Sequence, residues 1–417
     1  MAYEHACRYR GDLTRARLDE SPRSVEDLLT AFVITLASTL WLISAGAPAG
    51  TEARVAYVVD AYGNQVFPVE LATMAVRDPI QVGATPTGIA IRPDGKRAYV
   101  ANWDSHSVSV IDTRSNTVVA TIPDLITPEQ IAVAPDGRTV YVVEVLGHSV
   151  AAIDADTNIV VRRYGLDAAS QAIAVSPDGR VLYAAIHSER SVRAIDTVTG
   201  DAVTIPVEPD AQMFAVFSLA ITPDGSFLYV PNQHGDTISV IDTQSQKVVA
   251  TLPTERPVSV AFAPDGKTAY ATAHVPTGYV NVIDTAAKAV VKTVPVEPLP
   301  LSIAVSPDGG TAYTWHSRPG TITPIDTATS EAGDPVRVRE PVSSWHSFLA
   351  ITPNQPPIAK LAASRRTVFA GEPAHFNATG SSDDLGIERF EFDFGDGERA
   401  SRRGGKASHV YSEPGTY

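Results

Sequence analysis

Three histidines carry the first chemistry that this sequence could perform. His274 and His316 are 42 residues apart, and His346 follows after another 30. Three imidazoles could hold a zinc or copper ion. On neighbouring sheets, however, they would start about 8 Å or more apart, which is too far for shared coordination unless the loops fold inward. Loop histidines that are solvated or bonded to backbone are the alternative, and we predict neither a metal nor another cofactor.

A wider set of polar and aromatic residues could form a pocket for a small molecule or a peptide. Glu144 and His316 are the two side chains that could activate a water molecule for hydrolysis. Tryptophans beside polar loop positions suit sugar or peptide ligands, although packing against a neighbouring sheet is their commoner role. The candidate ligand-binding residues are Glu144, His187, Met213, Phe214, His274, Trp315, His316, Trp345 and His346.

Composition and motifs exclude several other kinds of chemistry. The only cysteine is Cys7, so the rest of the chain has no disulfide and no thiolate metal site. The sequence lacks a Gly-x-Ser-x-Gly motif, a phosphate-binding loop, a His-Glu-x-x-His motif and a haem-attachment motif. A net charge of −14 argues against nucleic-acid binding, which needs a basic surface, and against adsorption to anionic lipid.

Seven copies of one pattern, about 42 residues apart, must position these side chains. Each copy consists of short runs rich in β-branched residues and separated by turns, which predicts four strands. Four-stranded repeats of this length are typical of β-propellers. The clearest copy runs Gly88-Ile-Ala-Ile-Arg-Pro-Asp-Gly95, Ala98-Tyr-Val-Ala-Asn102, Ser107-Val-Ser-Val-Ile-Asp-Thr113 and Thr117-Val-Val-Ala-Thr-Ile122. The turn prolines are Pro93, Pro135, Pro177, Pro223, Pro264, Pro307 and Pro353.

The turns divide the predicted ring into two faces. In Pro-Asp-Gly, proline presets the turn angle, aspartate accepts backbone hydrogen bonds and glycine takes the left-handed conformation. These turns join the first and second strands, and they share one face with the Ile-Asp-Thr turns between the third and fourth strands. The second-to-third-strand loops and the connections between sheets share the other face. The first face repeats and the second varies, so we expect specificity on the second.

The two ends of the repeat region complement each other. Ala56-Tyr-Val-Val-Asp60 reads as a second strand without a first, and Phe348-Leu-Ala-Ile351 as a first strand without a second. We expect these strands to pair and close the ring, which leaves no open sheet edge. The sequence therefore predicts an all-β fold with a seven-bladed β-propeller at residues 51–355.

The repeats resemble those of a known family. Tyr99-Val-Ala-Asn102, Tyr229-Val-Pro-Asn232 and the Val-Ile-Asp-Thr turns are similar to the YVTN-type propeller repeats of bacterial and archaeal surface-layer proteins, over about 300 residues. The resemblance implies a secreted or surface protein without assigned chemistry. Related seven-bladed propellers include lactonases and redox enzymes, so the fold alone does not choose a function.

Residues 356–417 read as a second module after the linker at Pro356-Pro357. Phe394-Gly-Asp-Gly397, His409-Val-Tyr411 and Pro414-Gly-Thr-Tyr417 resemble the polycystic-kidney-disease (PKD) domain, an immunoglobulin-like β-sandwich of extracellular proteins. In that family the module spaces other domains or mediates contacts. The family continues past Gly-Thr-Tyr with a final strand, so we expect an incomplete module with one edge unpaired.

The N-terminal 49 residues read as a targeting segment. Residues 1–27 form a leader with five arginines and six acidic residues. The run Leu28–Gly46 is apolar and uncharged, and we expect it to form a hydrophobic helix. Ala47-Pro48-Ala49 is compatible with signal-peptidase cleavage. Residues 28–49 are therefore a signal peptide or a membrane anchor.

These features together predict a secreted or cell-surface protein. The first hypothesis is a non-catalytic binding or scaffold protein, whose variable propeller face contacts a surface protein, a peptide or a cell-wall glycan. We expect no nucleic-acid partner, and membrane contact only through the N-terminal apolar segment. The alternative is a propeller enzyme, either a lactonase-like hydrolase or a metal-dependent oxidoreductase, with its site at the channel mouth.

Overall fold

The computed structural model describes residues 39–44, 54–207, 216–316, 318–340, 348–353, 360–365, 367–381, 387–413 and 415. Every regular element among them is a β-strand, as the sequence predicts. The described residues contain no helix that is long and apolar enough to cross a membrane. They fall into two compact units, one within residues 53–354 and the other drawn from residues 1–52 and 355–417.

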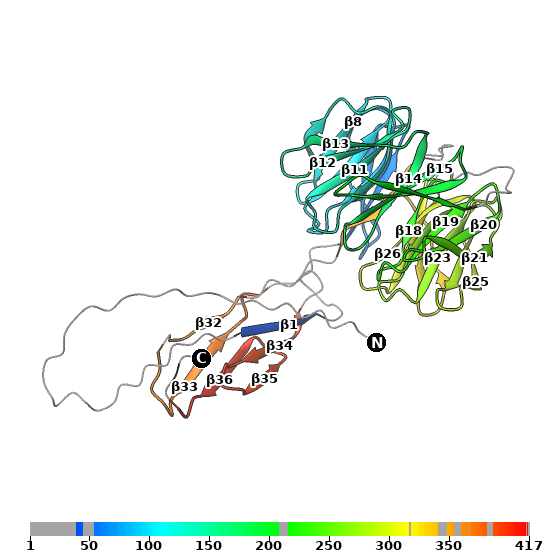
Figure 1. The fold of residues 1–417 in the computed structure, drawn as a ribbon. Coiled ribbons are helices and arrows are strands. Elements are labelled where there is room, and N and C mark those ends of the chain that lie inside the picture. The colour runs from blue at the N-terminus through cyan, green and yellow to red at the C-terminus, as the bar shows by residue number, and fades with distance from the viewer. Residues whose placement is uncertain are drawn as a thin grey trace, which may run out of the picture. The chain divides into compact units, whose positions relative to one another are not determined.

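Within residues 54–353, the described part of the first unit consists of seven antiparallel sheets, six of which follow chain order from the innermost strand outward (Figure 1). Their strands are β6 (Pro86–Ile91), β7 (Arg97–Asn102), β8 (Ser107–Asp112) and β9 (Thr117–Ile122); β10 (Pro128–Val133), β11 (Thr139–Glu144), β12 (Ser149–Asp154) and β13 (Ile159–Gly165); β14 (Ser170–Val175), β15 (Val181–Ile186), β16 (Ser191–Asp196) and β17 (Ala202–Pro206); β18 (Ala220–Ile221), β19 (Phe227–Asn232), β20 (Thr237–Asp242) and β21 (Lys247–Pro253); β22 (Pro257–Phe262), β23 (Thr268–Ala273), β24 (Tyr279–Asp284) and β25 (Ala289–Pro295); and β26 (Pro300–Val305), β27 (Thr311–His316), β28 (Thr321–Asp326), β29 (Glu331–Ala332) and β30 (Val336–Arg337).

The seventh sheet joins the two ends of the repeat region and confirms the predicted closure. Its strands are β31 (Leu349–Ile351), β2 (Val55–Asp60), β3 (Gln65–Glu70), β4 (Ala75–Val76) and β5 (Ile80–Gln81). β31 pairs with β2, with Leu349 opposite Val58 and Ile351 opposite Ala56. The innermost strands β6, β10, β14, β18, β22, β26 and β31 contact one another in a closed ring. The first unit is therefore a β-propeller-like fold.

The closing strand also belongs to the cores on both of its sides. Leu349 packs in a cluster with Trp315 of β27, whereas Ala350 packs against a cluster that contains Ile89 of β6. Successive side chains of a strand point to opposite faces, so three residues of β31 serve two inter-sheet cores. Removal of this strand therefore opens both cores as well as one sheet edge.

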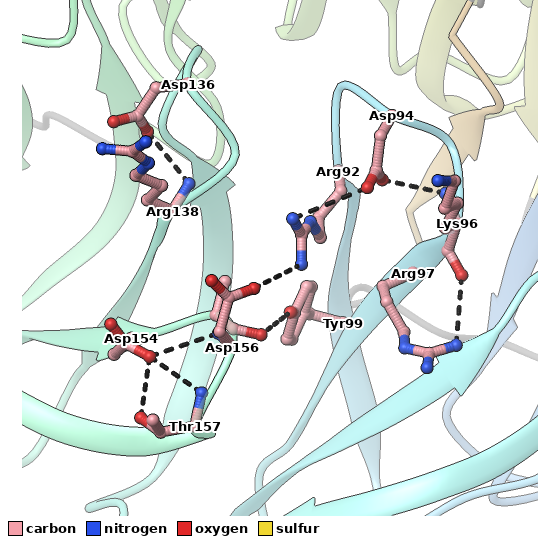
Figure 2. Close-up of polar contacts among 11 residues, drawn as sticks. Arg92, Asp94, Lys96, Arg97, Tyr99, Asp136, Arg138, Asp154, Asp156 and Thr157 are labelled. Atoms are coloured by element: carbon pink, nitrogen blue, oxygen red, sulfur yellow. Dashed lines mark hydrogen bonds and ion pairs between the residues drawn. The ribbon is translucent and has the colours of Figure 1, made fainter. Parts of the chain in front are cut away.

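The Pro-Asp-Gly face is held by one hydrogen-bond network that recurs from sheet to sheet (Figure 2). The carboxylate of Asp94 accepts a bond from the backbone N–H of Lys96 at 3.0 Å, as expected for a capped turn. The hydroxyl of Thr113, in the Ile-Asp-Thr turn, donates to the carbonyl of Gly95 at 2.5 Å. This bond ties the two turns of one sheet together, and threonines 197, 243, 285 and 327 donate in the same way.

Tyrosines on the second strands of two sheets bond to the next sheet. The hydroxyl of Tyr99 donates to the carbonyl of Ala155 in the following sheet at 3.2 Å (Figure 2). Tyr57 likewise donates to the carbonyl of Thr113 and to Asn116. Burial raises the pKa of both phenols, so these hydroxyls remain donors. All seven copies carry a buried tyrosine here: Tyr57, Tyr99, Tyr141, Tyr183, Tyr229, Tyr270 and Tyr313.

The second unit contains two three-stranded sheets. One is β1 (Thr39–Ser44), β34 (Ile387–Asp393) and β35 (Arg399–Arg402), and the other is β32 (Ala362–Ala363), β33 (Pro373–Asn377) and β36 (Lys406–Val410). His409 lies flat on the ring of Phe394, with ring centroids 4.3 Å apart, and its Nε2 is 2.5 Å from the carboxylate of Asp396. The two sequence motifs of this module therefore bind each other across its core.

The predicted N-terminal helix is wrong where the structure describes it. Thr39–Ser44 forms strand β1, which pairs antiparallel with β34 along its length. Apolar length and hydropathy do not distinguish helix from strand, whereas Thr39, Trp41 and Ile43 favour β-structure, and β1 covers an edge of β34. The leader at residues 1–27 and the rest of the 28–49 segment lie outside the described residues.

Deletion of residues 348–352 should lower the melting temperature of the whole first unit in a single transition, because it opens two cores at once. The substitution Leu349→Ala should cost about 2–5 kcal/mol, as for other buried leucines. Val291→Ala, at an outer-strand residue that is 61% exposed, should cost under about 0.5 kcal/mol. Thermal unfolding followed by circular dichroism measures the stability of all three variants. A deletion variant that melts at the parent temperature would refute the claim that this strand closes the ring.

Candidate functional site

The second-to-third-strand loops share one backbone feature in all seven sheets. The residue before each third strand has a positive φ, between 46° and 71°. Glycine, asparagine and aspartate tolerate this conformation, while the histidines and arginine that also adopt it are held there by the loop. The backbone therefore enters each third strand in the same conformation, while the side chains at this position differ. These residues are Asn64, His106, His148, Arg190, Asp236, Gly278 and Gly320.

Apolar side chains project from this loop face. Tyr62 is 65% exposed, Leu146 is 68% exposed and Ile126, in the neighbouring connection, is 47% exposed. Charged and polar loop residues such as Asp104 and Glu189 are exposed beside them. A rigid frame with differing exposed side chains is suited to binding a macromolecule rather than to enclosing a small reactant.

The second-strand ends beneath the loops are buried. Each pairs with the first residue of the third strand. Ala273 opposes Tyr279, so the candidate His274 lies one step beyond the equivalent position. The loop after β23 has one residue more than the other second-to-third-strand loops. The aligned residues are Asp60, Asn102, Glu144, Ile186, Asn232, Ala273 and His316, all at most 5% exposed.

Glu144 is fully engaged by structural partners. Its side chain has no exposed surface, and Arg163 binds both of its oxygens, with Nε–Oε2 at 2.8 Å and Nη2–Oε1 at 3.1 Å. The hydroxyl of Ser149 and the backbone N–H of Ile126 donate to the same carboxylate. A carboxylate that accepts bonds from four donors anchors the loop, which makes it a poor candidate for a water-activating base.

His316 and Trp315 are also buried completely. His316 Nδ1 lies 3.4 Å from the carbonyl of Pro298, and burial lowers the pKa of His316 to about 4. The guanidinium of Arg339 lies over the ring of Trp315, 5.6 Å from its centroid, and Arg339 Nε is 3.4 Å from Asp60. The Arg339 guanidinium therefore bridges Trp315 of the last sheet and Asp60 of the closing sheet, and Trp315 packs between these sheets.

The other two predicted histidines that the structure describes lie against backbone carbonyls. His187 lies 2.9 Å from the carbonyl of Val216, and His274 lies 3.3 Å from the carbonyl of Pro300 in the following sheet. Burial lowers the pKa of both histidines. The described residues contain no group of three or more His, Cys, Asp or Glu side chains arranged to hold a metal. The other candidates lie outside the described residues: Met213, Phe214, Trp345 and His346.

One buried acidic residue was missed by the sequence reasoning. Glu129 on the innermost strand β10 is 2% exposed, and the amide of Gln171 on β14 donates to both of its carboxylate oxygens, at 3.2 and 3.1 Å. The equivalent residues are Thr87 of β6, Gln171 of β14, Val258 of β22 and Leu301 of β26. A charged residue at a position that these copies fill with an uncharged one was the available signal.

Comparisons with known proteins agree with this two-part architecture. Residues 354–417 match the family model of the PKD domain. This module is PKD-like. No curated protein matches the chain.

Solved structures resemble the ring at low sequence identity. Kuenenia stuttgartiensis hydrazine synthase has a TM-score of 0.56 at 19% identity, over 76% of this chain and 95% of that one. A functionally unknown protein from Desulfotomaculum acetoxidans has a TM-score of 0.60 at 20% identity, over 72% of this chain and 99% of that one. A putative 6-phosphogluconolactonase from Bacteroides uniformis has a TM-score of 0.59 at 16% identity, over 72% of this chain and 100% of that one. Likeness at this identity supports the fold alone.

Arg163→Met should destabilise the first unit by about 1–3 kcal/mol, because Glu144 remains buried with fewer donors. The loss of stability should fall at the lower end of this range, because the Arg163 side chain is 44% exposed and its charge is partly screened by solvent. Arg138→Met, at an exposed arginine just before β11, should change stability by under about 0.5 kcal/mol. Urea unfolding measures both, and equal losses would show that the ion pair does not anchor the loop.

Acidification should destabilise the ring between about pH 6.5 and pH 4. In the unfolded chain, His316 becomes protonated as the pH falls through its ordinary pKa of about 6.5. In the folded ring, its pKa is lowered to about 4, so between these values the unfolded state binds the proton more strongly and the free energy of unfolding falls with pH. His187 and His274 act in the same direction.

The test compares the free energy of unfolding at pH 7.5 and pH 5. His316→Asn should reduce the difference by about 2 kcal/mol. His148→Asn, at an exposed loop residue with positive φ, should leave it unchanged. The assignment to His316 is wrong if its variant and the parent lose equal stability on acidification.

Proposed function

We propose that this chain is an exported, non-catalytic binding or scaffold protein of the cell surface. The propeller-like ring, at residues 51–355, presents its loop face to a surface protein, a peptide or a cell-wall glycan. The PKD-like module, at residues 356–417, spaces or tethers the ring. No nucleic acid is involved, and the membrane is contacted only through the N-terminal apolar segment.

The contrast between the two faces carries this proposal. On the Pro-Asp-Gly face, recurring side chains such as Asp94 and Thr113 bond to the backbone of their own sheet. On the loop face, the backbone recurs while exposed side chains such as Tyr62 and Leu146 differ from sheet to sheet. Interfaces are enriched in such exposed aromatic and aliphatic groups on a pre-formed frame, which limits the entropy cost of binding.

The surface-layer assignment rests on the YVTN-like repeats and on the match to the PKD domain. Tyr99-Val-Ala-Asn102 and Tyr229-Val-Pro-Asn232 are the copies nearest to the YVTN pattern. PKD domains are typical of extracellular proteins, which favours a secreted or cell-surface location, and the single cysteine suits a chain folded without disulfides.

The enzyme alternative has less support. A putative lactonase and hydrazine synthase share the fold, but at 16% and 19% identity. The two side chains that could serve a hydrolase have structural partners. Glu144 is paired with Arg163, and His316 is buried next to the Pro298 carbonyl. A water-activating base must reach its water, and neither side chain is exposed.

The experiment screens the purified protein against arrays of cell-wall glycans and peptides, and then tests any binder with loop-face variants. Tyr62→Ala and Leu146→Ala should each weaken binding about fivefold or more, as expected when an interface aromatic or aliphatic group is truncated. Both variants should keep the parent melting temperature.

Val161→Ala is the matched control, because Val161 lies on the outer strand of the same sheet as Leu146 and is similarly exposed, at 63%. It should bind like the parent. Equal weakening in the control, or hydrolysis of a lactone that Glu144→Gln abolishes, would contradict a binding role for the loop face.

A further inference from the structure

An open groove lies in the PKD-like module. Its volume is about 640 Å³, and it is lined by the sheet β32–β33–β36 together with the end of β35. Apart from the buried Phe376, the residues that line it are polar or small, and most are exposed. Those that carry hydrogen-bonding or charged groups are Ser364, His375, Asn377, Arg402, Lys406 and Ser408.

Strand register places four of these residues as two cross-strand pairs. His375 lies opposite Ser408, and Asn377 lies opposite Lys406, in the antiparallel pair of β33 and β36. Ala374, Phe376 and His409 alternate with them and are buried in the sandwich core. The sheet therefore presents an imidazole, an amide, a hydroxyl and an ammonium group side by side on its solvent face.

Two cations in the groove have no carboxylate partner among the described residues. Ion pairs of this part of the chain involve Arg399 with Asp393 at 3.1 Å, and His409 with Asp396, but neither Arg402 nor Lys406. Within the part of the chain that the structure describes, the Arg402 guanidinium bonds one carbonyl, that of Ser401, at 2.9 Å. In a protein of net charge −14, two such cations at one groove form a local site for negative charge.

We propose that this groove binds the carboxylate groups of an extended acidic polysaccharide. A guanidinium forms paired hydrogen bonds to a planar carboxylate, and an ammonium adds a second point charge. Asn377, Ser364 and Ser408 supply donors and acceptors for sugar hydroxyl groups. An open, polar groove on a sheet face accommodates a chain that continues at both ends, which an enclosed pocket does not.

The experiment measures binding of the full chain to polygalacturonate, to its fully methyl-esterified form and to polyphosphate. The acidic polymer should bind, with an affinity that falls as salt is raised, and the esterified form should not bind. Arg402→Gln and Lys406→Gln should each weaken binding about tenfold. Both side chains are exposed, so the parent melting temperature should be retained.

Arg399→Gln is the matched control, because Arg399 lies on the same strand as Arg402 but is paired with Asp393 and does not line the groove. It should bind like the parent. Absence of binding, equal weakening in the control, or tighter binding to polyphosphate would each overturn the proposal. Leu146→Ala should leave this binding unchanged, so failure here is separate from failure of the loop-face function.

Discussion

The ring depends on the pairing between β31 and β2, which joins opposite ends of the repeat region. Without it, β2 would expose a row of unpaired backbone groups. The same short strand places Leu349 in one inter-sheet core and Ala350 beside the next. Among the sheets of the ring, this one alone pairs strands from opposite ends of the repeat region within the described residues.

Closure explains why the two faces of the ring have such different characters. On the Pro-Asp-Gly side, recurring side chains bond one sheet to the next: Tyr99 reaches the next sheet and Arg92 lies 3.3 Å from Asp156 (Figure 2). On the loop side, bonds between sheets come from side chains that differ from copy to copy, such as His274 and Arg339. The second-strand ends beneath the loop face are buried, and Glu144 anchors a loop by bonding to Ile126 and Arg163.

Local sequence predicted the strands, the turns and the ring closure, because each is encoded by short-range chemistry. Pro-Asp-Gly marks a turn whichever sheet it occupies, and Asp94 caps it as expected. The candidate site was less predictable. The partner of Glu144 is Arg163 on another strand, and the register shift between Ala152 and Ile153 decides which side chains of β12 and β13 lie side by side.

The N-terminal segment shows the same limit, since the run that contains β1 has the hydropathy of a helix but pairs with β34. Partners chosen by tertiary context cannot be deduced from one strand alone.

The tyrosine on each second strand has a consequence for how such a chain could arise and change. Tyr57 and Tyr99 make the same kind of bond to the next sheet, so two successive sheet junctions are held by one shared rule. A circular permutant whose new termini open in a turn that takes part in neither bond would keep both of them.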